Sequence, residues 1–359
     1  MRRAAAPACA LPCLVAGALA LFLASACGAP PAPKPAPAAT PALHVSPLGD
    51  IVPAAGLSVL LLARPRELAA RADLIPAVKE LASERSFDAF AERNGGVDLR
   101  KLEELAVARY GDTTLFVART AFEPSRVEGA FTLHLATVLG RAIDRHGDAA
   151  GQISRTWGEG PEGREQLALL GKSALALEQG KLGPVRAVEL FAEGRLKKAA
   201  PALRTPLLAR AGELVGDAPL RVFAPGPFDE TRGLGGLLAA TTAVAIAVRF
   251  PPPRSPTTAV PADVTVALLG AWKDDGPAAS ERLLAVADTL GASSLGRLCG
   301  LDHPLRPATV RPTADALVLE VTVDALAVTR GLHAALDAQV DEIMRYGTPH
   351  APAPLTPVR

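Results

Sequence analysis

The stretch TTAVAIAVRF at residues 241–250, followed by DVTVALLGAW at residues 263–272, decides the fold class. Both segments are rich in β-branched and aliphatic residues, and a proline-rich loop from Pro251 to Pro261 joins them, which predicts two long strands. The apolar run from Leu237 to Val248 is too short to cross a bilayer and is interpreted as a buried strand. We therefore expect antiparallel sheet in the C-terminal half of the chain.

The elements on either side of this strand pair predict the rest of that half. Pro277 begins a helix, Asp324 is a good N-cap for the last helix, and Gly347 ends that helix. The predicted strands of this half are Leu220–Ala224, Thr241–Phe250, Asp263–Trp272, Ala308–Arg311 and Ala316–Val323.

A similar order of elements occurs earlier in the chain. Helices are predicted after Arg64-Pro65 and from Pro124, and Gly111-Asp112 predicts a hairpin turn. The predicted strands here are Ser58–Ala63, Leu105–Tyr110, Thr114–Arg119, Gln152–Trp157, Gln166–Leu170 and Ala174–Glu178. The order suggests an α+β fold of antiparallel sheets with helices packed on one face, and an internal duplication of β-α-β-β-α-β-β units.

Composition divides the chain into five segments. Residues 44–215 and 216–347 form the two α+β halves, and a shorter proline-rich segment follows them. The full division is 1–26 signal peptide, 27–43 lipidated cysteine with a Pro/Ala-rich tether, 44–215 first half, 216–347 second half and 348–359 Pro-rich tail.

The leader is a short positive start followed by an apolar stretch, Ala10–Ala26, that ends in small residues before Cys27. The sequence Leu23-Ala24-Ser25-Ala26-Cys27 resembles the lipobox of bacterial lipoproteins, which implies cleavage before Cys27 and a lipid on its sulfur. Two alternatives stay open. Ala24-Ser25-Ala26 also suits the ordinary signal peptidase, which would leave a free thiol, and an uncleaved leader would act as a membrane anchor.

The segment after Cys27 suits a membrane tether. Pro and Ala dominate Gly28–Leu43 and favour polyproline II, giving a reach of about 50 Å at roughly 3.1 Å per residue. In composition, leader and α+β order, the chain resembles envelope lipoproteins of Gram-negative bacteria. Gly28 is not the Asp associated with inner-membrane retention, so the resemblance implies the outer membrane, facing the periplasm or the cell surface.

Charge and cysteine content exclude several classes of function. Without residues 1–26 the chain has 36 Lys and Arg against 37 Asp and Glu, so no basic excess points to nucleic acid or to anionic lipid. Cys9 and Cys13 leave with the leader. Cys299 is then unpaired, and it suits a buried small hydrophobe better than a nucleophile activated by His303.

Three short motifs resemble nucleotide-binding or metal-binding sequences, but each match is weak. Gly158–Gly163 matches G-x-G-x-x-G, with Glu178 where a ribose-binding acid would lie, but Pro161 removes a donor and two glutamates would repel a pyrophosphate. Gly171-Lys172-Ser173 lacks the first glycine of a P-loop and suits a turn. Asp144, His146 and Asp148 alternate as metal ligands could, beside Arg141 and Arg145, which would oppose a cation.

These observations predict no catalytic residue, no cofactor and no metal site, and they assign lipidation to Cys27. The expected partners are the membrane, through that lipid, and an envelope protein, with no nucleic acid. We expect a membrane-anchored envelope lipoprotein, non-enzymatic, that acts in protein interaction or structure. A carrier or sensor of an apolar small molecule and an enzyme with a dispersed site remain alternatives.

Overall fold

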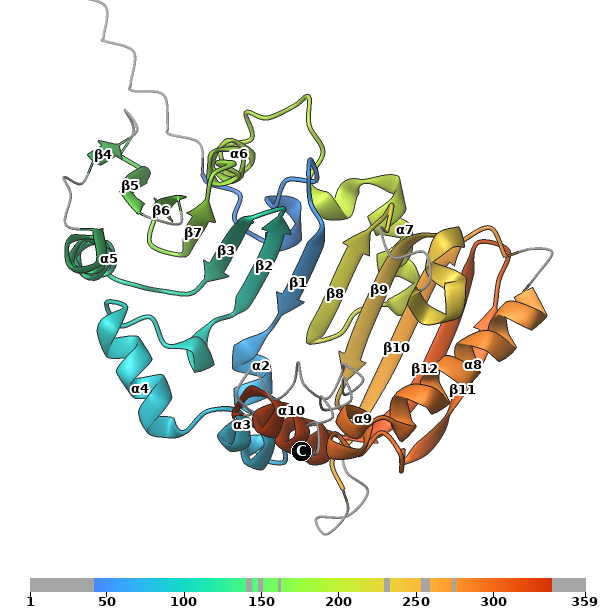
Figure 1. Cartoon of the computed structure of the whole chain (residues 1–359). Coiled ribbons are helices and arrows are strands. Elements are labelled where there is room, and N and C mark those ends of the chain that lie inside the picture. Colours follow the sequence, from blue (N-terminus) through green and yellow to red (C-terminus); the bar gives the residue numbers. More distant parts are fainter. Residues whose placement is uncertain are drawn as a thin grey trace, which may run out of the picture. The chain divides into compact units, whose positions relative to one another are not determined.

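A computed structural model describes residues 42–139, 144–147, 151–160, 163–228, 233–252, 259–272 and 276–337. Within these ranges the strands form one antiparallel sheet of twelve (Figure 1). Its order is β4 (Asp144–Gly147), β5 (Ile153–Gly160), β6 (Gly163–Leu170), β7 (Ala174–Gly180), β3 (Thr113–Arg119), β2 (Glu104–Tyr110), β1 (Val59–Ala63), β8 (Leu220–Pro225), β9 (Thr241–Arg249), β10 (Pro261–Gly270), β12 (Ala316–Asp324) and β11 (Arg306–Pro312).

The α+β class is confirmed, and the predicted strands are present with small shifts at their ends. The predicted strand Gln152–Trp157 runs from Ile153 to Gly160, and β4 is an additional strand where a loop was expected. Gly111-Asp112 does join β2 to β3. The leader, nearly all of the tether, the C-terminal part of the last predicted helix and the Pro-rich tail lie outside the described residues.

Helices pack on both faces of the sheet, so the expectation of helices on one face was wrong. The helices are α2 (Pro65–Ala69), α3 (Ile75–Leu81), α4 (Glu84–Arg93), α5 (Pro124–Leu139), α6 (Val185–Ala192), α7 (Pro206–Val215), α8 (Gly276–Ala292), α9 (Ser294–Leu298) and α10 (Ala325–Asp337). The physical reason is that several strands are apolar at every position. Neighbouring side chains point to opposite faces, so such strands expose apolar surface on both.

One face, called here the covered face, carries the largest core. It is defined by the paired residues Ala108, Leu60, Phe223 and Ala245, all of which are buried. The buried sides of α6 and α7 pack on it, together with Leu48, Ile51 and Val52 from the segment that precedes β1. This core takes side chains from both halves of the chain, which ties them into one packed structure.

The opposite face is called here the open face. Helix α5 packs at one end of it, over Leu167 and Leu169 of β6, and α8 packs at the other end, over Leu317 and Leu319 of β12 (Figure 1). Both helices bury small apolar clusters of their own. A fourth apolar cluster, around Leu74, packs at the N-terminal end of β10 and the C-terminal end of β12.

Within the sheet, the two halves of the chain meet at one strand pair. β1 and β8 are antiparallel neighbours, with Leu61 opposite Val222. Outward from β1 the order is β2, β3, β7 and β6, and outward from β8 it is β9, β10, β12 and β11. Among the described helices none is long and apolar enough to cross a membrane.

Candidate functional site

A single row of apolar side chains crosses the centre of the open face. The strand register places these residues directly opposite one another, each on the next strand of the sheet. In sheet order the row, called here the central row, is Leu177, Phe116, Val107, Leu61, Val222 and Ile246. Side chains opposite one another share a face, so the six form a continuous apolar band.

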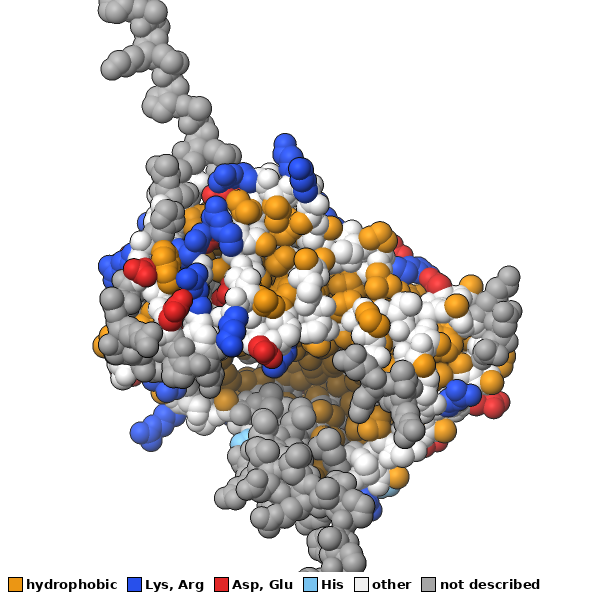
Figure 2. All heavy atoms as spheres, turned by 45° about the horizontal axis from the view of Figure 1, so that its top comes forward, with side chains coloured by type: hydrophobic (Ala, Val, Ile, Leu, Met, Phe, Trp, Pro, Cys, Tyr) orange, Lys and Arg blue, Asp and Glu red, His pale blue; other side chains and the backbone are white. Residues whose placement is uncertain are grey.

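The central row lacks the cover that the rest of the sheet has. All six side chains are only half-buried, and none belongs to a buried apolar cluster of the described residues. Beyond its two ends the row continues into covered residues, Leu167 under α5 and Val266 beside the cluster of α8. In the view of Figure 2, hydrophobic side chains gather around a hollow in the molecule. Partly exposed apolar side chains in a continuous band are typical of a binding surface.

Polar side chains of β2 and β3 border this apolar band. Arg109 lies two residues beyond Val107 on the same strand and therefore on the same face, opposite Val59 and Thr114. Its Nε donates to the carbonyl oxygen of Gly111 at 3.1 Å, and Val59 beside it is 38% exposed. An exposed arginine thus stands next to the apolar band.

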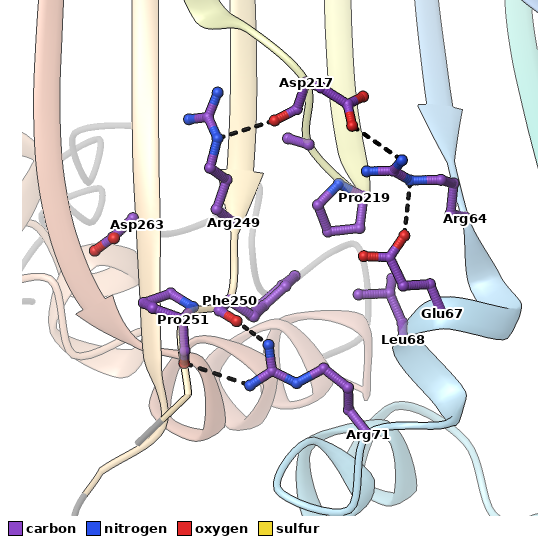
Figure 3. A pocket seen from close by; sticks show the side chains of 11 residues that line it. Arg64, Glu67, Leu68, Arg71, Asp217, Pro219, Arg249, Phe250, Pro251 and Asp263 are labelled. Atoms are coloured by element: carbon purple, nitrogen blue, oxygen red, sulfur yellow. Dashed lines mark hydrogen bonds and ion pairs between the residues drawn. The ribbon is translucent and has the colours of Figure 1, made fainter. Parts of the chain in front are cut away.

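A second feature, a pocket of about 350 Å³, lies where the two halves meet (Figure 3). Its arginines are already engaged in ion pairs and hydrogen bonds. Arg64 contacts Glu67 at 2.9 Å and Asp217 at 3.0 Å, while Arg249 donates to the carbonyl oxygen of Asp217 at 2.9 Å. Arg71 donates to the carbonyl oxygen of Phe250. These pairs hold the ends of β1, β8 and β9 together, which is a structural role.

A neighbouring pocket of about 520 Å³ shares Arg249 and Asp263 with the first one. Asp263 accepts a hydrogen bond from the hydroxyl of Thr322 at 2.6 Å, and Glu320 on the same strand as Thr322 is exposed. By strand register these side chains lie on the covered face of β10 and β12, further along the strands than Ala267. The bond between the Thr322 hydroxyl and the Asp263 carboxylate joins β12 to β10.

Two fully buried carboxylates have structural partners. Glu178 of β7 accepts hydrogen bonds from the backbone N–H groups of Gly183 and Val185, each at 2.9 Å, at the start of α6. Burial raises the pKa of the Glu178 carboxyl, and these two N–H groups act in the opposite direction. Glu189 of α6 is bound by Arg155 and Arg186. Neither acid lines either of the two pockets described above.

The three weak motifs are not brought into a site by the described residues. Gly158 and Gly163 belong to the hairpin of β5 and β6, and residues 161–162 lie outside the described part of the chain. Gly171-Lys172-Ser173 forms the turn between β6 and β7, as predicted. Asp144 and His146 lie on β4, Asp148 is outside the described residues, and the described side chains include no cluster of three metal ligands.

Cys299 was considered as a nucleophile and Cys27 as the site of lipidation, and the structure describes only the first. Cys299 is buried and burial raises the pKa of its thiol, while the side chain of His303 is 90% exposed and lies 3.7 Å from Asp302. A protonated, buried thiol is a poor nucleophile. Cys27, to which the sequence assigns the lipid, lies outside the described residues.

Comparison with known proteins adds no family. No protein-family model matches the chain, and no curated protein or solved structure is significantly similar to it. The functional argument therefore depends on the residues of the open face.

The central row was not recognised in the sequence analysis. Each strand was predicted, but alternation did not distinguish its two faces, because Ala245 and Ile246 are both apolar and point opposite ways. The sequence signal that could have revealed the row is the presence of strands that are apolar on both faces. Such a strand needs packing partners on both sides, and the described helices cover only part of the open face.

Proposed function

We propose that this chain is an envelope lipoprotein, held by a lipid on Cys27, that binds an apolar partner on the open face and performs no chemistry itself. One observation carries the binding role: six half-buried apolar side chains lie side by side on adjacent strands without cover from the described residues. Each of these side chains is already partly buried, so covering it would contribute less than about 1 kcal/mol to a complex.

The proposed anchoring is supported by the leader and by the tether that follows it. The described chain begins near α6, where the backbone N–H of His44 donates to the carbonyl oxygen of Ala192 at 2.8 Å. A polyproline tether of about 50 Å would let this domain work away from the bilayer surface. We place the protein in the outer membrane because residue 28 is Gly.

Intact mass and detergent partitioning test the anchoring. The protein from its native envelope should begin at Cys27 and carry a diacyl- or triacyl-sized mass increment, and Cys27→Ala should release it from the membrane. A wild-type protein that is free of lipid and partitions with the aqueous phase would contradict the anchoring and favour plain secretion.

Binding of a neutral environment-sensitive dye such as Nile red tests the open face. The double variant Val107→Thr/Val222→Thr keeps side-chain shape and adds two hydroxyls to the central row, so dye fluorescence should fall several-fold. The matched control is Val310→Thr, whose side chain packs in the cluster of α8. Equal dye binding by the double variant and the wild type would contradict an accessible central row.

We also infer an internal duplication. It is supported by the matching strand orders on either side of β1 and β8, and by α5 and α8, which follow β3 and β10 respectively. The first half then carries β4 and β5 as an addition. In an experimental structure, β1, β2, β3, β7, β6 and α5 should superpose on β8, β9, β10, β12, β11 and α8 in that order. Failure of the helices to coincide would contradict duplication.

A further inference from the structure

We propose that the central row receives the acyl chain of an anionic amphiphile, and that Arg109 binds the acidic head group. The proposal deepens the binding role argued above and rests on it. It names the chemical class of ligand, a long apolar chain ending in a carboxylate or phosphate, and the residues that recognise each part.

The backbone of the central strands argues for an acyl chain. β3, β2, β1 and β8 are each hydrogen-bonded on both sides, so their N–H and C=O groups are already paired within the sheet. The six side chains of the central row have no polar atom. A peptide in extended form would lay its own polar backbone on this surface without partners. An acyl chain has no such groups, so it can be buried there without leaving a hydrogen bond unmade.

The dimensions of the row also suit a chain-like ligand. Neighbouring strands are separated by about 4.8 Å, so a row over six strands spans about 24 Å. A second apolar row runs parallel to the central row on the same face, about 7 Å further along the strands. It includes Leu105, Ala63 and Leu220. The surface is therefore long, narrow and apolar.

Arg109 supplies charge complementarity at the edge of this surface. Its side chain shares the face with Val107, and the hydrogen bond from Nε to the carbonyl oxygen of Gly111 holds the guanidinium beside the turn between β2 and β3. Within the described part of the chain no carboxylate forms an ion pair with it; Asp112, in the same turn, is exposed. The two terminal nitrogens can therefore bind an oxyanion in bidentate geometry.

Fluorescence titration with dansylaminoundecanoic acid and with its methyl ester tests the proposal. The protein is the exported chain with Cys27→Ala, purified without detergent so that no other amphiphile competes. The acid should bind saturably and more tightly than the ester. Arg109→Gln should weaken the acid about tenfold and leave the ester unchanged, because it removes a charge-assisted bond to the head group alone. Arg109→Lys should restore part of the preference.

Variants of the apolar surface complete the test. Val107→Thr/Val222→Thr should weaken the acid and the ester equally. The matched control for Arg109 is Arg311→Gln, an exposed strand arginine on β11, which should change neither affinity.

Three outcomes would overturn the proposal. If Nile red binds but acid and ester bind equally in the wild type, or Arg109→Gln leaves their ratio unchanged, the anionic head group is excluded while the binding role stands. If the acid binds only after removal of residues 338–359, the C-terminal segment of the chain is the occupant. If neither Nile red nor the acid binds, the binding role itself fails.

Discussion

At the scale of single residues, Glu189 shows how a buried charge joins a helix to a strand. Its side chain has no exposed surface, and it accepts hydrogen bonds from Arg155 Nε of β5 and from Arg186 of α6, both at 2.6 Å. Arg155→Ala leaves the buried carboxylate without its better-buried partner. We expect a loss of about 3 kcal/mol in the free energy of unfolding, measured by urea denaturation.

Two variants control this prediction. Arg186 is 52% exposed, so Arg186→Ala should cost less than about 1 kcal/mol. The double variant Arg155→Met/Glu189→Leu removes both charges and should recover most of the loss. The prediction is wrong if Arg155→Ala and Arg186→Ala cost the same.

At the scale of elements, the end of β7 depends on close contact between its backbone and that of β3. The hydroxyl of Thr113 on β3 accepts hydrogen bonds from the N–H groups of Lys181 at 2.9 Å and Leu182 at 3.1 Å. Gly180 has φ +141°, and a Cβ there would lie 2.6 Å from the Cα of Thr113. This contact fixes the point at which β7 ends and the chain turns toward α6.

Gly180→Ala should therefore destabilise the protein by about 2–4 kcal/mol, because the added methyl group must displace the backbone of β3. Gly183 provides the matched control: it also has positive φ, +71°, but nothing lies within 4 Å of an added Cβ. Gly183→Ala should cost about 1 kcal/mol. Chemical denaturation measures both, and a larger loss for Gly183→Ala would contradict the argument.

At the scale of the whole molecule, the single sheet predicts cooperative unfolding of the two halves. β1 and β8 pair directly, and the core of the covered face includes Leu60 from one half and Phe223 from the other. The sequence contains two tryptophans, Trp157 in the first half and Trp272 in the second. Fluorescence of Trp157→Phe therefore reports the second half, and that of Trp272→Phe reports the first.

Each variant should give the same midpoint in urea by its remaining tryptophan as by circular dichroism. Trp272 is 4% exposed, so we expect Trp272→Phe to shift the midpoint for both probes together. Separate midpoints for the two probes within one variant would show that the halves unfold independently.

Local pattern was enough to predict most strands, because β-branched runs and turns are properties of a few neighbouring residues. Asp324 was likewise predicted as a cap, and its carboxylate accepts from the N–H of Leu326 at 3.2 Å. The pairing of β7 with β3 was not predictable in this way, since α5 and three strands separate them along the chain. The uncovered centre of the open face depends on that pairing, and so escaped prediction too.

The position of β11 at one edge of the sheet has a consequence for self-association. An edge strand offers unpaired backbone groups on which another copy could extend the sheet. Here β11 contains Pro307 and Pro312, which have no N–H to donate, and the exposed side chains of Arg306 and Arg311. Growth of the sheet by strand addition is opposed at this edge. If the proposed ligand leaves the central row, that uncovered apolar surface offers copies of the protein a second route to association.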